Sequence, residues 1–177
     1  IGRSRLLAEV ARRASPSRQV HTLQCLPTDR EHALLTVGRL VRSIRKVAGL
    51  REQPVVDGSV TAMFGRLALM LDDLGPVLLV VDDLHLADAA SVSVLRSLAA
   101  PGGALQLSLV VSSPVAPDGA VDDAEVALTA FTEADLQPLG IEAVWPETGG
   151  HPSILAACCA AGAAGVPLSA AVVGALR

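Results

Sequence analysis

The chain has 177 residues, of which 51% are hydrophobic and 18% charged, so it has the composition of a globular domain and not of a disordered chain. One Trp, two Phe and no Tyr argue against a single-strand nucleic-acid binder that stacks bases on aromatic rings. The net charge of -4 conceals a basic first third, because residues 1–51 hold 11 of the 14 Lys and Arg residues, which we interpret mainly as solvated helix faces.

The first half of the chain alternates helical and extended patterns. The spacing of Leu6, Leu7 and Val10 predicts a helix over Ser4–Ala14, and a loose alternation predicts a strand over Val20–Cys25. Apolar positions on one face predict a second helix within residues 34–48. A cap within residues 57–59 begins a third helix, which extends to about residue 74.

The second half begins with a strand that is apolar throughout. Val77–Val81 follows a Gly-Pro break, and only a strand covered on both faces is expected to lack polar positions. Asp88 is predicted to cap the next helix, and Leu105–Val111 is predicted to be a second buried strand. A weaker strand is expected over Glu125–Thr129.

The remaining residues predict short helices. Thr132 and Asp135 resemble a capping box, and Pro152 is suited to the first turn of a helix that follows two glycines. The alternating pattern predicts an α/β fold, a doubly wound parallel sheet over residues 1–130, followed by the start of a small helical lid over residues 131–177.

Cysteine usage and hydropathy indicate a cytoplasmic protein. Cys25, Cys158 and Cys159 form neither a disulfide framework nor a spaced metal site, and the chain does not open with the apolar run of a signal peptide. The uncharged segment Ile154–Leu176 is long enough to span a bilayer, but glycine and proline interrupt its centre. Two short packed helices explain it better.

Two acids end the apolar strand. Asp82 and Asp83 follow Val81, and open α/β sheets bind ligands at the carboxyl ends of their strands. One carboxylate in such a place can bind Mg²⁺, and a second can orient an attacking water. The alternative is an Asp-rich turn with no ligand.

A second motif lies at the start of the first predicted helix. Gly2, Arg3 and Ser4 match the end of a Gly-x-x-x-x-Gly-Lys-Ser/Thr phosphate loop, with arginine in place of lysine. The backbone N–H groups and the cation would contact phosphates, and the Ser4 hydroxyl would bind Mg²⁺. An ordinary helix cap would look the same, but the order of this motif and the acidic strand is the one that a P-loop ATPase needs.

Three stretches then carry a family resemblance. Residues 1–7 (Ile-Gly-Arg-Ser-Arg-Leu-Leu), residues 78–88 (Leu-Leu-Val-Val-Asp-Asp-Leu-His-Leu-Ala-Asp) and residues 148–152 (Thr-Gly-Gly-His-Pro) are together similar to the AAA-type ATPase domain of large LuxR-family regulators. That domain belongs to the STAND group of signal-transduction ATPases and also occurs fused to cyclase and kinase domains. The resemblance covers nearly the whole chain.

The resemblance implies roles for individual residues. Asp82 would bind Mg²⁺, Asp83 would lie beside the attacking water, and His85 would contact the γ-phosphate or a neighbouring group. Pro152 corresponds to a proline near the adenine of ATP or ADP. For His85 and Pro152, a surface histidine and a helix-starting proline are the simpler alternatives.

The departures from the family predict slow hydrolysis or none. Arg3 replaces the loop lysine, and a planar guanidinium does not reproduce a compact ammonium charge. Leu86 replaces a tryptophan, Asp83 is shorter than a glutamate, and residues 112–114 (Ser-Ser-Pro) lack the arginine that often follows this strand in the family. The strand and first glycines that precede such a loop are also missing, so we expect these 177 residues alone to bind ATP weakly, with an affinity poorer than micromolar.

The sequence therefore predicts a regulatory switch that binds ATP or ADP with Mg²⁺. Its expected partners are neighbouring helical-repeat and effector domains of the same polypeptide, and self-association is allowed, whereas membrane and direct nucleic-acid contact are not expected. A degenerate P-loop scaffold is the first alternative. A motor or remodelling ATPase is the second, but no convincing arginine finger is present, since Arg96 fits a helix surface.

Overall fold

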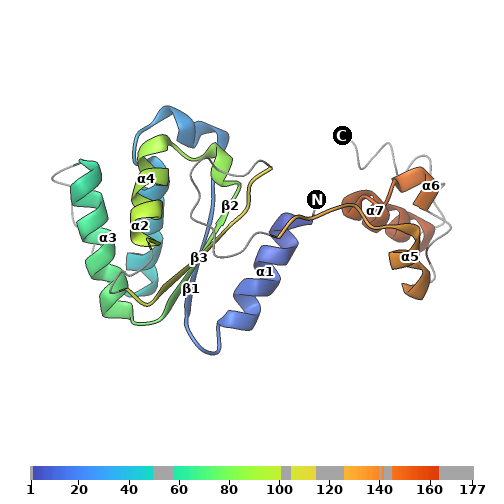
Figure 1. Cartoon of the computed structure of the whole chain (residues 1–177), viewed down its shortest axis with the longest axis horizontal. Coiled ribbons are helices and arrows are strands. Elements are labelled where there is room, and N and C mark those ends of the chain that lie inside the picture. Colours follow the sequence, from blue (N-terminus) through green and yellow to red (C-terminus); the bar gives the residue numbers. More distant parts are fainter. Residues whose placement is uncertain are drawn as a thin grey trace. The chain divides into compact units, whose positions relative to one another are not determined.

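The computed structural model describes residues 2–49, 58–100, 105–114, 126–139, 141 and 145–163. The chain divides into two compact units, one formed by Ser4–Asp123 and the other by Ile1–Arg3 together with Ala124–Arg177 (Figure 1). We call them the sheet unit and the C-terminal unit. The predicted division at residue 130 stays a prediction.

The sheet unit is built on three parallel strands. They are β1 (Gln19–Gln24), β2 (Val77–Asp82) and β3 (Leu107–Val111), in the order β1-β2-β3. Gln19 pairs with Val77, which in turn pairs with Leu107. The fold is therefore α/β with an all-parallel sheet, as the alternating sequence pattern predicted.

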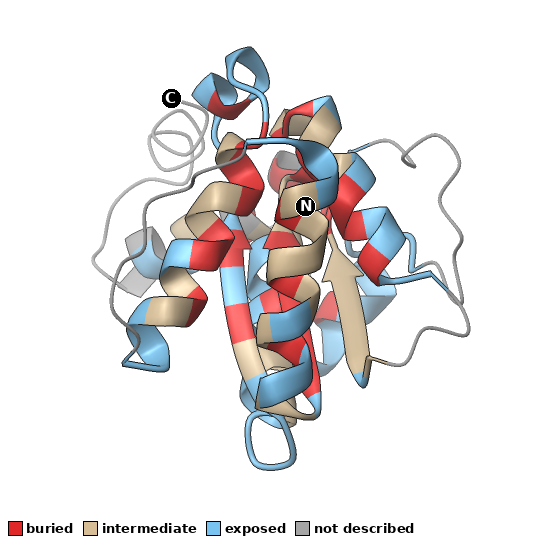
Figure 2. Cartoon of the chain, turned by 90° about the vertical axis from the view of Figure 1, so that its left-hand side faces the viewer, coloured by how far each residue is buried: buried red, intermediate tan, exposed pale blue. Residues whose placement is uncertain are grey.

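Helices cover both faces of this sheet. On one face lie α2 (Leu35–Val47), α3 (Val60–Leu74) and α4 (Ala89–Leu98), which form the larger core with the odd-numbered residues of β2 (Figure 2). On the other face α1 (Arg3–Ala14) packs Leu7 against Leu78 and Val80 of β2. Every apolar residue of β2 is buried, which confirms that it is the central strand.

The predicted caps of two helices are confirmed. The Ser59 side chain accepts a hydrogen bond from the N–H of Ala62 at the start of α3, and the Asp88 side chain accepts one from Ser91 at the start of α4. Asp57, at the start of the range predicted for the cap of α3, lies outside the described residues. Serine and aspartate occupy these positions because their oxygens satisfy N–H groups that have no partner within the helix.

Asp88 also holds the start of α2. Leu34, which precedes α2, has a left-handed backbone (φ 63°) and provides no side-chain cap. The Asp88 carboxylate accepts hydrogen bonds from the N–H groups of Leu34 (2.8 Å) and Thr36 (3.3 Å), while the Ser91 hydroxyl oxygen accepts one from Val37 (3.0 Å). One buried carboxylate therefore caps two helices.

The strand β3 differs from its prediction. It begins at Leu107 and not at Leu105, and each of its residues is only partly buried. In the described part of the chain no strand pairs with its outer edge, so β3 is an edge strand where a buried one was expected. Edge strands lose the lateral cover that makes a central strand inaccessible.

The C-terminal unit consists of short helices. They are α5 (Glu133–Leu136), η3 (Gln137–Leu139), α6 (Trp145–Thr148) and α7 (Pro152–Ala163). The capping box of Thr132 and Asp135 is confirmed, as is Pro152 in the first turn of a helix. The predicted strand at residues 125–129 is wrong for residues 126–129, which are irregular, and Glu125 lies outside the described residues.

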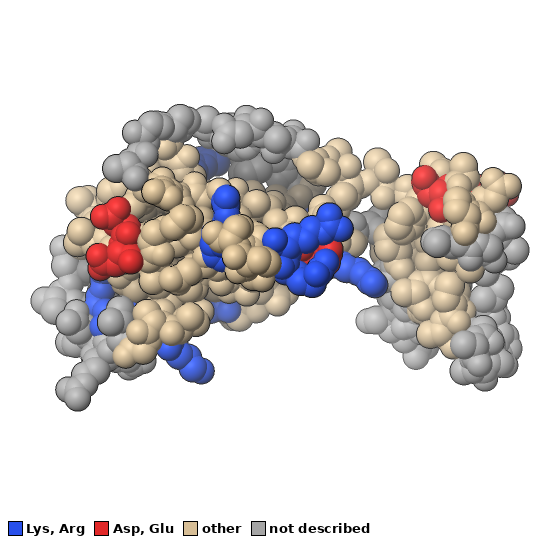
Figure 3. All heavy atoms as spheres, turned by 90° about the horizontal axis from the view of Figure 1, so that it is seen from below, with Lys and Arg blue, Asp and Glu red and all other residues tan. Residues whose placement is uncertain are grey.

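The exposed face of α1 accounts for part of the basic first third. The Glu9 carboxylate lies 2.7 Å from nitrogen atoms of both Arg12 and Arg13. Figure 3 shows a group of basic side chains that surrounds an acidic one in this way. No helix within the described residues is long and apolar enough to cross a membrane. The three cysteines are free thiols, with Cys25 and Cys158 buried.

Candidate functional site

The carboxyl ends of the three strands meet at one edge of the sheet. The N–H of Cys25, just after β1, donates to the carbonyl of Asp82 (2.9 Å), and the N–H of Ser112, just after β3, donates to the carbonyl of Val81 (2.9 Å). The parallel ladders therefore continue through these residues. This edge, which we call the carboxyl edge, is where parallel sheets bind their ligands.

Asp82 lies at the centre of the carboxyl edge and is held by two donors. Its Oδ1 atom accepts a short hydrogen bond from the Ser112 hydroxyl and a second from the N–H of Asp83 (3.1 Å). The two hydrogen bonds fix the direction of the carboxylate. Asp82 is only partly buried, so it remains accessible to solvent. A hard cation such as Mg²⁺ prefers an oxygen ligand of this kind.

Asp83 turns the chain sharply away from the strand. Its backbone is left-handed (φ 56°), a conformation that aspartate tolerates better than most residues. Its N–H also donates to the Ser112 hydroxyl oxygen (2.9 Å), and the short helix η2 (Leu84–Leu86) begins immediately after it.

His85 lies in η2, beside Asp83. Its Nδ1 atom is inaccessible and has no hydrogen-bond partner, since the Asp83 Oδ1 atom is 3.9 Å away and thus beyond hydrogen-bond distance. Its carbonyl oxygen accepts two hydrogen bonds from Arg30, through Nε (2.8 Å) and through Nη2. The His85 side chain is 29% exposed, so its predicted phosphate contact and the simpler interpretation as a surface histidine both stay predictions.

Arg30 lies in η1 (Pro27–Glu31), which is anchored by an ion pair between the buried Asp29 and the partly exposed Arg39. Asp29 is 1% exposed, and its carboxylate accepts hydrogen bonds from Arg39 Nη1 (2.8 and 3.1 Å) and from the N–H of Leu26 (3.0 Å). Burial, together with the nearby Asp29 charge, raises the pKa of the Cys25 thiol to about 12. Cys25 is thus a packing residue and not a nucleophile.

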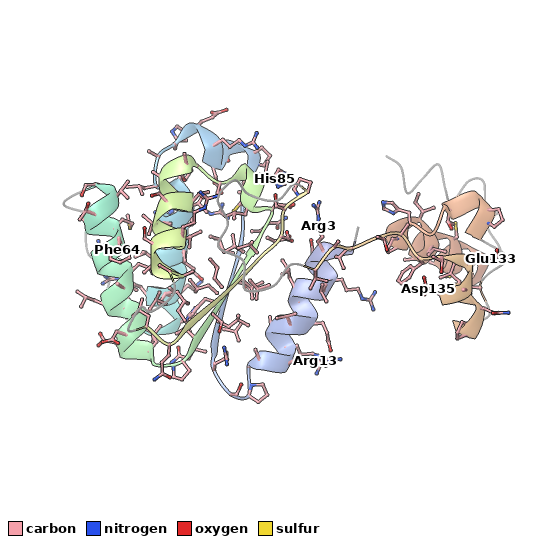
Figure 4. The ribbon with its side chains drawn as sticks, viewed as in Figure 1. Arg3, Arg13, Phe64, His85, Glu133 and Asp135 are labelled. Atoms are coloured by element: carbon pink, nitrogen blue, oxygen red, sulfur yellow. The ribbon has the colours of Figure 1, made fainter. Side chains whose placement is uncertain are left out.

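The amino end of α1 points to the same carboxyl edge. Only residues 15–18 separate the end of α1 from the start of β1, and α1 packs along the sheet through Leu7. The helix therefore runs antiparallel to the strands, with the exposed Ser4 toward their carboxyl ends (Figure 1). Figure 4 shows the same arrangement: His85 and Arg13 lie at opposite ends of the sheet unit.

Gly2 and Arg3 belong to the C-terminal unit by their contacts, although Arg3 is the first residue of α1. Gly2 has the left-handed backbone (φ 70°) that favours glycine. Pro152 also belongs to the C-terminal unit, where it starts α7. Ser4, Asp82, Asp83 and His85 are thus brought to one edge of the sheet unit, and the roles predicted for Gly2, Arg3 and Pro152 stay predictions.

Two residues of this edge were missed as site residues from the sequence. In the sequence, Ser112 stands out only as one of the residues that occupy the place of an arginine, yet it bonds both Asp82 and Asp83. Arg30 was not singled out, because its partner lies 55 positions away in sequence. Among the described residues, no three His, Cys, Asp or Glu side chains could together hold a metal ion. A metal at Asp82 would therefore need ligands such as a hydroxyl, phosphate or water.

Comparisons with protein-family models, with curated proteins and with solved structures gave no match. The function is therefore argued from the carboxyl edge itself.

Proposed function

We propose that this chain is an ATP- or ADP-binding regulatory switch domain, similar to the STAND-type ATPase domains of LuxR-family regulators, with slow or impaired hydrolysis. The observation that supports the proposal is that the amino end of α1, which carries Ser4, and the end of the central strand, which carries Asp82, point to the same edge of a parallel sheet. Helix amino ends attract phosphate, and strand-end carboxylates attract Mg²⁺.

The handedness of α/β connections supports the same arrangement. The connections from β1 to β2 and from β2 to β3 use helices on one face, whereas α1 covers the other face. Because such connections are right-handed, a strand leading into α1 would have to reach β1 from the β3 side. It would pair with the outer edge of β3, and the turn before Ser4 would then lie near Ser112.

Each residue at the edge has a part in this proposal. Asp82 and the Ser4 hydroxyl would hold Mg²⁺, and the backbone N–H groups at the amino end of α1 would contact the phosphates. Bound Mg²⁺ would neutralise phosphate charge. Asp83 would polarise a water molecule, and His85 would contact the phosphate end.

Slow ATP hydrolysis would follow from the hydroxyl that stands at the carboxyl edge where a cation is expected beside the transferred phosphate. Where a cation would sense the terminal phosphate, β3 is followed by Ser112, whose hydroxyl is bonded to Asp82 and Asp83. Phosphoryl transfer depends on positive charge at that position. A domain that binds nucleotide but turns it over slowly can act by population shift, changing how neighbouring domains pack.

Nucleotide binding by the full-length protein tests the proposal. We expect calorimetry to show ATP or ADP binding in the presence of Mg²⁺, and Asp82→Ala to weaken it by at least tenfold. Asp73→Ala is the matched control, because Asp73 is exposed at the end of α3, which leads into the opposite edge of the sheet. Equal binding by wild type and Asp82→Ala would refute the proposal.

A non-binding scaffold is the second candidate. It is favoured by Arg3 in the lysine position and by the hydroxyl at the end of β3 where a cation is expected. If the full-length wild-type protein binds neither ATP nor ADP, the scaffold is the correct function.

A further inference from the structure

Arg30 joins the segment that follows β1 to the segment that follows β2. Its guanidinium donates to the His85 carbonyl through Nε (2.8 Å) and through Nη2. The preceding carbonyls, of Asp83 and Leu84, accept hydrogen bonds from N–H groups three positions further along the chain (2.8 and 2.9 Å). The His85 carbonyl instead accepts from a side chain 55 positions away, so η2 is held from outside as well as by its own backbone.

The backbone that carries Arg30 is itself held by a buried carboxylate. Asp29, which is 1% exposed, accepts hydrogen bonds from the N–H of Leu26 (3.0 Å) and from Arg39 Nη1 (2.8 and 3.1 Å). Arg39 Nη2 also donates to the Gln24 carbonyl at the end of β1 (3.1 Å). Because η1 is fixed to α2 and to β1 in this way, the two hydrogen bonds from Arg30 can fix the position of η2.

The η2 segment needs such support. Asp83, which precedes it, has a left-handed backbone (φ 56°) and provides no side-chain cap, and this conformation costs about 1–2 kcal/mol in a residue other than glycine. A three-residue helix of this tight kind has few hydrogen bonds of its own to offset that cost. The contact with Arg30 therefore contributes to holding His85, whose Nδ1 atom lies 3.9 Å from Asp83 Oδ1.

We propose that Arg30 is a positioning residue that, by bonding the His85 carbonyl, holds His85 where its ring contacts the terminal phosphate of ATP, and thereby favours ATP over ADP. An imidazole N–H can donate a hydrogen bond to a phosphate oxygen. ADP lacks the terminal phosphate, so its binding does not depend on this contact. The inference rests on the proposed nucleotide function, because it assigns the residues that distinguish ATP from ADP at the same site.

The test compares side chains of similar length at position 30. Arg30→Gln keeps an N–H donor at the same number of bonds from the backbone as the arginine Nε, but has no charge. Arg30→Met keeps an unbranched chain and has neither donor nor charge. Arg42→Met removes another exposed arginine, on α2, as a control. ATP and ADP, each with MgCl₂, are titrated into the full-length protein by calorimetry, and thermal unfolding is followed for each variant.

We expect Arg30→Met to lose roughly three- to tenfold of the affinity for ATP, the size expected for a net hydrogen bond, and to keep the wild-type affinity for ADP. Arg30→Gln should keep most of the affinity for ATP, because the donor and not the charge holds the His85 carbonyl. Arg42→Met should bind both nucleotides as the wild type does.

Four results would overturn this inference alone. They are a wild-type ATP affinity in Arg30→Met, an equal loss of ATP affinity in Arg30→Gln and Arg30→Met, a loss of ADP affinity as large as the loss of ATP affinity, and a wild type that binds ADP but not ATP. If Arg30→Met does not fold, Arg30→Ala takes its place, and failure of both shows a purely structural role. If the wild type binds neither nucleotide, the proposed function itself fails.

Discussion

Removing the Asp88 carboxylate should remove hydrogen bonds from the starts of both α2 and α4. Its oxygens accept hydrogen bonds from Ser91 in α4 and from Leu34 and Thr36 at the start of α2, and Asp88 is 3% exposed. Loss of a helix cap costs about 1 kcal/mol, and each buried N–H left without a partner costs about 1–3 kcal/mol. We therefore expect Asp88→Ala to lower the free energy of unfolding by roughly 3–5 kcal/mol.

Asp88→Ser separates the two contributions. A serine hydroxyl can still cap α4, but it is too short to bond the N–H groups at the start of α2. We expect Asp88→Ser to lower the free energy of unfolding by about 2–3 kcal/mol, less than Asp88→Ala does. Urea unfolding of the whole chain followed by circular dichroism gives these values, with the exposed Asp73→Ala as a control expected within about 0.5 kcal/mol of wild type.

Acid should remove the same stabilisation. Burial opposes ionisation of Asp88, but hydrogen bonds from Ser91, Leu34 and Thr36 outweigh it, so its pKa lies below the ordinary 3.8. Its contribution is thus present at neutral pH and is lost as the pH falls below 3.8 and through the lower folded value. The reasoning is refuted if Asp88→Ala unfolds at the wild-type urea concentration, or if Asp88→Ser is as stable as wild type.

Three further predictions concern a histidine, a pair of glycines and two cysteines. The buried His21 has no hydrogen-bond partner for Nε2, and burial lowers its pKa below 6.5. The free energy of unfolding of the wild type should therefore fall as the pH drops from 6.5. His21→Leu should be about 1–2 kcal/mol more stable at neutral pH and should lack this pH dependence in urea unfolding. A Cβ at Gly150 would lie 1.8 Å from a backbone oxygen, whereas one at Gly149 would meet nothing within 4 Å. In thermal unfolding Gly150→Ala should therefore cost several times the ~1 kcal/mol expected for Gly149→Ala, and equal costs would contradict this. Mass spectrometry after brief thiol labelling at pH 8 should find the exposed Cys159 modified, and Cys25, with a pKa of about 12, modified only on unfolding.

Features that depend on local sequence were predicted well. The uninterrupted apolar run of β2 identified a central parallel strand, and Ser59 and Asp88 were identified as caps because their side chains bond residues only three positions away. Each of these features depends only on residues within one turn of a helix or within one strand. A single sequence carries them in full.

Features that depend on distant partners were not predicted. The burial of β3 was overstated, because an edge strand and a central strand share one apolar pattern. The Asp88 contact with α2, the Arg30 contact with His85 and the Ser112 contact with Asp82 each join residues at least 30 positions apart. At the carboxyl edge the sequence therefore identified Asp82, but not the residue that fixes its direction.

The absence of hairpins from the described sheet has a consequence for how the protein is made. Gln19 can pair only after Val77 has been synthesised, and Val77 in turn awaits Leu107 on its other side. No strand finds its partner in the segment that immediately follows it, so the helices form first while apolar strand segments remain exposed. A nascent chain of this design is vulnerable to aggregation until β3 has emerged from the ribosome, and chaperone dependence during synthesis should decline once Val111 has cleared the exit tunnel.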